Sequence, residues 1–579
     1  MDLKVFKRRT CSAIFIDQNV RESRSSATAS WLITMTLTKL LVVCLIALPL
    51  LVALRLVLPY PSSGRNVGSA YARSLGKGSH NGTSVGKKDG YIQSPEVAKY
   101  KDKLLGGLLS PGFHESSCLS RYQSSLYRKA SPYKPSPYLL SRLRNYEDLH
   151  RRCGPNSNPY RRALNELMFG QNITTSRETE CNYVVWISYS GLGNKILTVA
   201  STFLYAILTN RVMLIDPRQD MSNLFCEPFP ESSWFLPKEF PLINKFDLFG
   251  QKSSDSFGNM LKNNILNSSA ESQTSYLYLH LPHDYDDYDK LFFCDQEQPL
   301  LSKVPWLILK SNQYFVPSLF LMPGFEQQLN MLFPHKTTVF HHLGRYLFHP
   351  SNQVWGLITR YYQAYLAKAD EKIGIQIRVF DGSVGPSQYV TDQILSCTLN
   401  QKLLPQVDEQ KFIVPPLSGN PKQKAVLLTS LSNGYYEILR NMYWQNPTVT
   451  GDLIGIYQPS HEEFQQTEKQ SHNRKAWAEI YLLSLTDVLV TSAWSTFGYV
   501  AHGLGGLRPW VLYKLDENNL TVPDPPCAQL MSMEPCFHAP PYYDCKAKTG
   551  VDTGKLVPYV RHCEDISWGV KIVDTHFDI

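Results

Sequence analysis

"NYVVWISYSGLGNKILTVASTFLYAILTNRVMLID", residues 182–216, is the stretch that decides the fold. An apolar run at Val184–Ile187 leads into a Gly-x-Gly turn, a helical pattern follows, and a second apolar run covers Val212–Ile215. Two short apolar runs joined by a helix are typical of a βαβ unit with parallel strands. The dinucleotide fingerprint needs a third glycine, but Ile196 occupies that position. A tight strand-to-helix turn is therefore favoured over a phosphate-binding turn.

The same alternation returns in the second half of the chain. Apolar runs typical of buried parallel strands alternate there with helical patterns. Two such units in succession predict two facing Rossmann-like domains, with the site in the crevice between them. Strands are predicted at 306–309, 373–380, 425–429, 453–457, 488–491 and 510–513, and helices at 138–152, 353–369, 435–444, 476–483 and 495–504.

An uncharged stretch from Leu40 to Leu54 lies near the N-terminus. Together with residues 31–38 it provides the roughly 20 residues that cross a bilayer. Six Lys and Arg residues precede it, between residues 4 and 24, and such a flank predicts a cytosolic N-terminus. A cleaved signal peptide is the alternative, but no small-residue cleavage site follows Arg55. The sequence therefore predicts an uncleaved signal anchor, with the rest of the chain in the lumen.

Sequons and cysteines support this topology. Four glycosylation sequons follow the anchor, at Asn81, Asn172, Asn267 and Asn519. Ten of the 12 cysteines also follow it, and an even number in an oxidising compartment suits disulfides. A zinc site is less favoured because no Cys-x-x-Cys pair is present. The four cysteines between 527 and 563 are expected to staple the C-terminal tail.

The second half also contains a better candidate for anion binding than the opening turn. In "DVLVTSAWSTFGYVAHGLGG" an apolar strand ends shortly before Ser495 and Thr496, which stand where a helix begins. Hydroxyl side chains there cap the helix, and the same geometry directs free N–H groups at an anion. The side chains of Trp494 and Phe497 offer an apolar wall beside a nucleobase. The glycines between 503 and 506 are expected to end the helix.

Arg378 is a lone charge near the end of an apolar run. Charged side chains are seldom fully buried without a partner, so a salt bridge with Asp381 is one interpretation. The other is a guanidinium at the carboxyl edge of a parallel strand, where it would bind a diphosphate through paired hydrogen bonds.

The chain contains five long motifs, "IGIQIRVFD", "SLTDVLVTSAWSTFGYVAHGLGGLRPWVLY", "VFHHLGRYLFHPSNQVWG", "SMEPCFHAPPYYDCKAKTG" and "RHCEDISWG". Together they resemble the plant cell-wall fucosyltransferases of the xyloglucan α-1,2-fucosyltransferase type. The resemblance runs from about Asn182 to the C-terminus. It implies a single-pass type II Golgi membrane protein with a GT-B-like fold, GDP-fucose as donor, inversion at the fucose carbon, and no metal or other cofactor.

The resemblance also assigns roles to residues. Arg378 matches the family's diphosphate-binding arginine, and Ser495, Thr496 and Phe497 match the segment that lines the GDP pocket. Because the nucleotide of such two-domain transferases lies mainly in the C-terminal domain, the turn Gly191–Asn194 would face the sugar and acceptor. Asn194 is a candidate for a catalytic hydrogen bond to substrate, and equally for a residue that only holds the turn.

The acceptor proton needs a base, and a positioned carboxylate is the usual one. Asp381, Asp286 and Asp289 are the candidates. In "KSNQYF", Asn312 stands where some relatives carry Asp, which weakens a base at that position and points to a different acceptor. Xyloglucan galactose and arabinogalactan-protein arabinose are both plausible acceptors within the family.

Two rival interpretations stay open. In "HDYDDYDK" the pairs Asp284/Asp286 and Asp287/Asp289 match the Asp-x-Asp of metal-dependent glycosyltransferases, whose cation bridges the diphosphate. An acidic surface loop explains the same residues, and Arg378 makes a metal unnecessary. The other rival is an inactive luminal carbohydrate-binding protein, against which the intact "SAWSTFGYVA" argues.

The net charge of +8 over 579 residues, without a dense basic run, gives no support for nucleic-acid binding. A homodimer is possible.

The expected organisation of the chain has six parts. They are a cytosolic tail (1–30), the anchor (31–58), a flexible stem (59–110), an N-terminal catalytic half on the acceptor side (111–370), a C-terminal GDP-fucose-binding domain (371–525) and a Cys-rich tail (526–579).

Overall fold

The computed structural model describes most of the chain after residue 101. The described residues are 102–169, 181–218, 221–266, 274–380, 386–411, 421–466, 469–514 and 521–575. All of them belong to a compact unit that spans Ile92–Ile579. The predicted cytosolic tail, anchor and most of the stem lie outside the described residues. So do Asp381 and the four sequon asparagines at 81, 172, 267 and 519.

The first sheet contains the predicted βαβ unit. Four parallel strands run in the order β2-β1-β4-β3, and every residue of β1 and β2 is buried, as in a sheet covered on both faces. Helix α5 (Leu192–Thr209) connects β1 to β2 and ends at Asn210 in the left-handed conformation. The strands are β1 (Tyr183–Ile187), β2 (Val212–Ile215), β3 (Tyr276–His280) and β4 (Trp306–Lys310).

Helix α5 is long and apolar enough to cross a bilayer, but 83% of its 18 residues are buried inside the protein. It is therefore the core helix of this half. The helices around the first sheet include α2 (Leu119–Tyr127), α3 (Pro137–Cys153), α4 (Asn158–Phe169), α6 (Met221–Leu224), α7 (Phe257–Lys262), α8 (Gln298–Ser302), α9 (Val316–Leu319) and α10 (Pro323–Leu332).

The second sheet has six strands in the order β10-β9-β8-β5-β6-β7. Five are parallel, and all five predicted strands after residue 370 are found. The sixth, β10, pairs antiparallel with β9 and comes from the predicted tail, so the second sheet continues past residue 525. The strands are β5 (Glu371–Gln376), β6 (Gln423–Thr429), β7 (Leu453–Tyr457), β8 (Val488–Ser492), β9 (Trp510–Leu512) and β10 (Cys527–Gln529).

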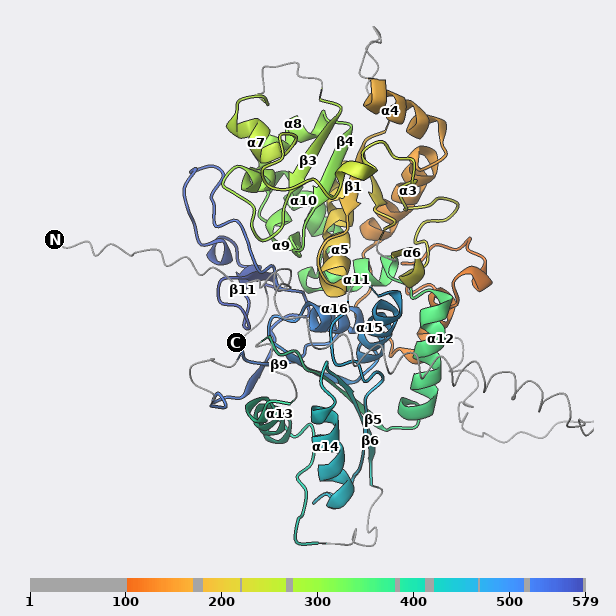
Figure 1. Ribbon diagram of the computed structural model, residues 1–579, viewed down its shortest axis with the longest axis vertical. Helices are drawn as coiled ribbons and strands as arrows, with labels where there is room; N and C mark the ends of the chain where they lie inside the picture. Colours follow the sequence, from red (N-terminus) through yellow and green to blue (C-terminus); the bar gives the residue numbers. More distant parts are fainter. Residues whose placement is uncertain are drawn as a thin grey trace, which may run out of the picture. The chain divides into compact units, whose positions relative to one another are not determined.

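A layer of helices from both halves packs together and lies between the two sheets (Figure 1). Helix α16 contacts α5, α11 and α15, and one buried apolar cluster extends from the first sheet through these helices. A second cluster on the other side of the second sheet includes buried residues of α13 (Gln388–Asn400) and α14 (Gly434–Gln445). The remaining helices are α11 (Val339–Leu347), α12 (Asn352–Tyr361), which continues as a π-helical turn (Tyr362–Leu366), α15 (Gln470–Leu483) and α16 (Thr496–Gly505).

Both ends of the folded unit depart from the predicted boundaries. Leu108 and Leu109 are 2% and 0% exposed, so the folded part begins before residue 111 and the stem is shorter than predicted. Only one disulfide, Cys536–Cys563, lies within the tail. The other two tail cysteines reach into the two halves, in the pairs Cys294–Cys545 and Cys397–Cys527. The remaining pairs are Cys118–Cys226 and Cys153–Cys181, so all ten predicted luminal cysteines are oxidised.

Candidate functional site

Two helix N-termini meet where the halves join. Gly193 lies in the first turn of α5 and presses against the first turn of α16. A Cβ atom on Gly193 would lie 2.6 Å from Thr496 Oγ1 and 2.9 Å from the Phe497 nitrogen. Only glycine allows so close an approach. Because each helix start directs free N–H groups and a positive dipole outward, their meeting makes a region of positive potential.

Ser495 serves the helix that it begins. Its hydroxyl accepts a hydrogen bond from the Gly498 nitrogen at 3.3 Å, and the side chain is buried. Capping, one of the two interpretations of this hydroxyl, is therefore its role in the structure. Thr496 and Phe497 are half-buried beside it. The helix ends at Gly506 in the left-handed conformation, as predicted.

Arg378 follows the end of β5 rather than lying within a strand. The Arg378 nitrogen donates to Ser492 Oγ at 2.9 Å, which turns the chain out of the sheet. The guanidinium donates to Gln465 Oε1 at 3.0 Å. Gln465 in turn approaches the N-cap of α5, because its Nε2 lies 3.6 Å from where a Cβ on Gly191 would stand. Arg378 is thereby connected through Gln465 to the paired helix starts.

Partial burial lowers the pKa of Arg378 below its ordinary value, and desolvation is the cause. The predicted partner, Asp381, lies outside the described residues. Among the residues that are described, no carboxylate forms an ion pair with this guanidinium. A partly buried cation beside two helix starts is suited to binding an anion, which would offset the cost of desolvation.

The C-terminal tail builds the other wall of this region, which sequence reasoning missed. The Trp494 nitrogen donates to Asp565 Oδ2 at 3.1 Å, and the Trp494 indole nitrogen donates to the Asp565 carbonyl oxygen at 2.7 Å. Tyr499 Oη donates to the same carboxylate at 2.5 Å. These bonds hold Trp494 at φ 63°, a backbone conformation that is uncommon outside glycine. Trp568 and Lys514 lie against the Trp494 ring, at 5.3 and 4.5 Å.

Asn194 is used by its own turn. Its Nδ2 donates to Ser190 Oγ at 2.9 Å, and Ser190 has φ 70°. Its carbonyl oxygen accepts from Thr198 Oγ1 at 2.7 Å. The structure therefore shows the turn-holding role, and a bond to substrate stays a prediction.

The acidic run that follows β3 does not assemble a metal site. Asp284 bonds to His280 at 3.2 Å, and this hydrogen bond lowers the pKa of Asp284. Asp286 accepts from the backbone nitrogens of residues 288 and 289, at 2.8 and 2.9 Å. Asp287 pairs with Lys290 at 2.7 Å. Each carboxylate serves a nearby partner, as in an acidic surface loop.

Asp289 differs from its neighbours because it is 1% exposed. Burial raises its pKa to about 6. Its Oδ2 accepts from the Asp286 nitrogen at 3.2 Å, and its side chain packs on Gly258. These contacts lie within the first half, so neither Asp286 nor Asp289 is brought to the helix starts as a base.

Asn312 lies just after β4, at the carboxyl edge of the first sheet. Its Oδ1 accepts from the His283 nitrogen at 3.0 Å and from Gln313 Nε2 at 2.8 Å. Its Nδ2 lies 2.9 Å from His283 Nδ1. An amide cannot act as a carboxylate base, so here Asn312 organises the edge and takes no proton.

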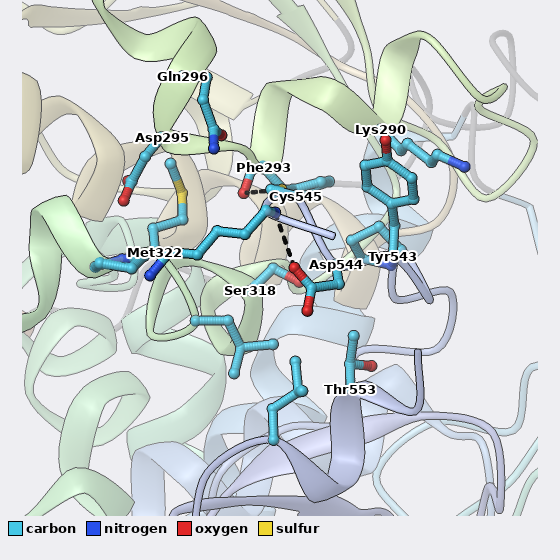
Figure 2. Close-up of a pocket in the computed structure, with 15 residues that line it drawn as sticks. Lys290, Phe293, Asp295, Gln296, Ser318, Met322, Tyr543, Asp544, Cys545 and Thr553 are labelled. Carbon is cyan, nitrogen blue, oxygen red and sulfur yellow. Dashed lines mark hydrogen bonds between the residues drawn. The ribbon is translucent and has the colours of Figure 1, made fainter. Parts of the chain in front are cut away.

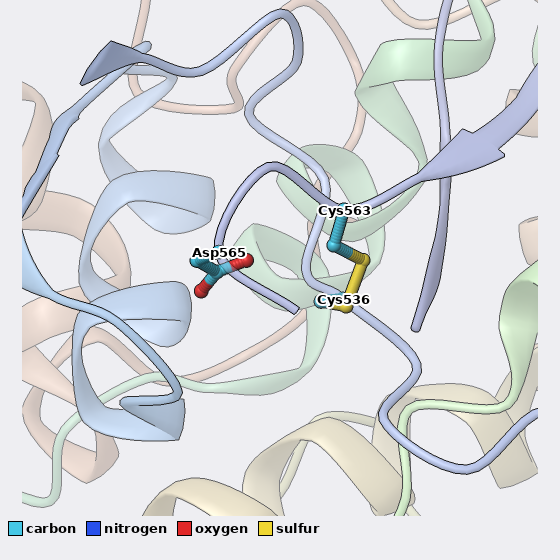
Figure 3. A group of neighbouring side chains, drawn as sticks. All are labelled: Cys536, Cys563 and Asp565. Carbon is cyan, nitrogen blue, oxygen red and sulfur yellow. A yellow bond between two sulfur atoms is a disulfide. The ribbon is translucent and has the colours of Figure 1, made fainter. Parts of the chain in front are cut away.

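One group of potential metal ligands occurs among the described residues. The ligand atoms of Cys536, Cys563 and Asp565 lie within 4.8 Å of one another. The two sulfur atoms form a disulfide, and Asp565 extends beside it (Figure 3). Disulfide sulfurs are not the thiolates that bind metals, so this group holds the tail in place.

Comparisons with known proteins agree on one family. Residues 79–546 match the family model described as xyloglucan fucosyltransferase. The chain is 59% identical over 546 residues to a galactoside 2-alpha-L-fucosyltransferase of Arabidopsis thaliana, with 93% of each protein covered. It is 62% identical over 478 residues to a galactoside 2-alpha-L-fucosyltransferase of Pisum sativum, with 83% of each covered. A solved structure of an Arabidopsis thaliana FUT1 mutant in complex with GDP superposes with a TM-score of 0.76 and 62% identity, covering 82% of this chain and 100% of that one.

Proposed function

Because the chain belongs to the xyloglucan fucosyltransferase family and is a fucosyltransferase that uses GDP-fucose, we propose how its site performs the transfer. The donor diphosphate lies between Arg378 and the starts of α16 and α5. The observation that carries this proposal is the contact of Gly193 with Thr496 and Phe497, beside a guanidinium without a carboxylate partner among the described residues. Parallel sheets in both halves are consistent with a GT-B-like transferase.

The chemistry is a single displacement. The acceptor hydroxyl attacks the fucose carbon from the side opposite to GDP, which inverts the configuration. Negative charge develops on the departing diphosphate, and Arg378 with the helix N–H groups stabilises it without reorganisation. Trp494 and Phe497 give the nucleotide an apolar wall, supported from the tail by Asp565.

The reaction needs no metal in this proposal. Arg378 and two helix starts supply the positive charge that a cation would bring, and the Asp-x-Asp carboxylates are engaged elsewhere. With Asp286 and Asp289 held by their own turn, Asp381 is the remaining candidate for the base. It follows Arg378 closely in sequence, which supports a place near the donor.

We propose a galactoside of a cell-wall polysaccharide as the acceptor, because two relatives are named as galactoside 2-alpha-L-fucosyltransferases. Arabinogalactan-protein arabinose is the second candidate, which the family resemblance leaves open. The basic flank, the apolar segment and the sequons support a type II protein of the Golgi membrane.

An acceptor panel tests the proposal. The luminal part of the protein would be incubated with GDP-fucose and either galactosylated xyloglucan, xyloglucan stripped of galactose, or an arabinogalactan protein. We expect transfer to the first alone, with linkage analysis placing fucose on O2 of galactose. Transfer only to the arabinogalactan protein would reject the galactoside acceptor.

A further inference from the structure

His538 lies in the C-terminal tail beside the start of α16. Its Nε2 atom lies 3.2 Å from Tyr499 Oη in the first turn of that helix, and the centres of the two rings are 5.5 Å apart. Tyr499 Oη donates to Asp565 Oδ2 at 2.5 Å, and the same carboxylate accepts from the Trp494 nitrogen. His538 therefore ends a chain of hydrogen bonds that reaches the proposed donor loop.

This chain of bonds fixes which nitrogen of His538 carries the proton. A carboxylate can only accept, so the Tyr499 proton lies toward Asp565. Tyr499 Oη then accepts from His538, which places the imidazole proton on Nε2. The Nδ1 atom of the neutral ring is left with a free lone pair, and an imidazole in this state can take a proton.

The Nδ1 atom is also open to a ligand. Among the described residues it has no hydrogen-bond partner, and it is not one of their fully buried polar atoms that lack a partner. The side chain as a whole is half-buried. Desolvation by burial lowers the pKa of His538 to about 4, which is close to that of an ordinary carboxylate. The ring therefore keeps its lone pair at neutral and mildly acidic pH.

The residue after His538 connects the tail to the carboxyl edge of the first sheet. The Ala539 nitrogen donates to Gln313 Oε1 at 3.2 Å, and Gln313 Nε2 donates to Asn312 Oδ1 at 2.8 Å, just after β4. Ligands of folds with parallel sheets bind at this edge. His538 therefore lies between the proposed donor loop and the edge of the half that is expected to hold the acceptor.

Two disulfides hold the tail on either side of His538. Cys536 pairs with Cys563, and Cys545 pairs with Cys294 of the first half. A cavity of about 200 Å³ lies between the tail and the first half at the second disulfide, and Figure 2 shows Cys545 on its wall. The stretch that carries His538 is thus fixed at both ends, as a group that takes a proton in a transition state needs to be.

We propose that His538 is a catalytic residue that removes the proton from the acceptor hydroxyl, with Tyr499 and Asp565 as positioning residues. The inference rests on the proposed donor site. The acceptor oxygen bonds to the fucose carbon while the bond from that carbon to the diphosphate oxygen breaks, and the electron pair leaves with GDP. The acceptor proton passes to His538 Nδ1. The imidazolium donates from Nε2 to Tyr499, the Asp565 carboxylate stabilises its charge, and the proton is then released to solvent.

His538→Ala in the full-length protein, with GDP-fucose and galactosylated xyloglucan, tests the base. We expect kcat to fall about a hundredfold, because a general base contributes that much or more. The KM for GDP-fucose should stay within about twofold, since the imidazole acts on the acceptor. Imidazole added to the buffer should raise the kcat of the variant about tenfold, because it can occupy the vacated place and take the proton.

His562→Ala is the matched control. His562 is a half-buried histidine of the same tail, and its Nε2 lies 2.7 Å from Asp552 Oδ1. This variant should keep native kcat and show no response to imidazole. Tyr499→Phe tests the positioning role, because it removes the bond to Nε2 and keeps the ring. Its kcat should fall about tenfold without recovery in imidazole, since the His538 ring still fills its place.

A folded His538→Ala protein with kcat within a few-fold of native would overturn the assignment, and so would a fall in kcat that imidazole leaves unchanged. If His538→Ala fails to fold, His538→Gln decides by its kcat, because the amide keeps a donor for Tyr499 and cannot take a proton. Native kcat in that variant would overturn the base. Asp381 is the competing base, and Asp381→Asn should retain most activity. Loss of activity in Asp381→Asn alone would assign the proton transfer to that carboxylate.

Calorimetry with GDP separates this inference from the proposed donor site. His538→Ala should bind GDP as the native protein does, because the imidazole contacts the acceptor, and a large loss of GDP affinity would overturn the assignment. Unchanged GDP affinity in Arg378→Ala would reject the proposed donor site, whereas recovery of His538→Ala in imidazole would still support His538 as the base.

Discussion

Gly193→Ala is expected to separate the two helix starts that form the proposed donor site. The new Cβ would lie 2.6 Å from Thr496 Oγ1 and 2.8 Å from the Thr496 carbonyl carbon. Ordinary contact begins near 3.4 Å and the nearest backbone atom would be at 2.8 Å, so the start of α16 must move by about 0.6 Å. Two of the three nearest atoms belong to the backbone, and a side-chain rotation cannot relieve those contacts.

The substitution should affect function more than stability. Overpacking of this kind costs about 1–3 kcal/mol, which lowers the Tm of a unit this large by only about 1–3 °C. A displacement of about 1 Å at positioning groups can reduce the rate by about a hundredfold. We therefore expect kcat/KM for GDP-fucose to fall about a hundredfold, and GDP affinity to weaken, in a protein that still melts cooperatively.

Gly191→Ala is the matched control, because its Cβ would meet only the mobile Gln465 amide, at 3.6 Å. It should keep kcat/KM within a few-fold of native. Calorimetry with GDP, thermal melts and donor kinetics on both variants measure the effects. If Gly193→Ala bound GDP as native does, the donor would not lie at the meeting of α5 and α16.

Four further outcomes are expected. Arg378→Ala should lower the rate about a hundredfold, which corresponds to near 3 kcal/mol of transition-state stabilisation. Arg378→Lys should restore little of it, because an ammonium lacks the planar, forked geometry of a guanidinium. Unchanged GDP affinity in Arg378→Ala, measured by calorimetry, would show that Arg378 is not part of the donor site. Treatment with EDTA should leave most transfer activity intact, and loss that manganese restores would favour the Asp-x-Asp interpretation. Protease added to sealed Golgi vesicles should leave the folded unit intact. Digestion of the folded unit would show that it faces the cytosol and that the predicted topology is wrong. Burial raises the pKa of Glu534 from 4.5 to about 8, so its contribution to stability is present below about pH 4.5 and is lost as pH rises through about 8. We therefore expect the Tm of the native protein to fall over this pH range and that of Glu534→Gln to fall less. An unaltered Tm profile in the variant would show that Glu534 does not cause the fall.

Periodicity predicted the sheets well because strands and helices are local patterns. β7 was predicted at its observed bounds, and α3 and α16 within one residue at each end. The strand predicted at 373–380 was too long, since Val379 and Phe380 continue the apolar run after β5 has ended. Composition alone could not show that Ser492 draws the Arg378 backbone out of the sheet.

The features that sequence reasoning missed are long-range. Asp565 lies 71 residues after Trp494, and no local pattern links a tail carboxylate to a loop tryptophan. Gly193 was expected to face the sugar, but its contact with Thr496 requires both halves to be folded. The cysteines gave the right count but no pairing, because partners such as Cys294 and Cys545 are separated by 251 residues.

The tail pairing has a consequence for biosynthesis. In a chain made from its N-terminus, Trp494 is added 71 residues before its partner Asp565. The proposed donor loop therefore reaches its final conformation only after Asp565 has been added and Cys527, Cys545 and Cys563 have paired with upstream cysteines. A chain that ended at residue 529 would keep the strands of both sheets but would lack Asp565 and the disulfide partner of Cys294. Full transfer activity is therefore expected only after the C-terminal tail has been synthesised and its disulfides have formed.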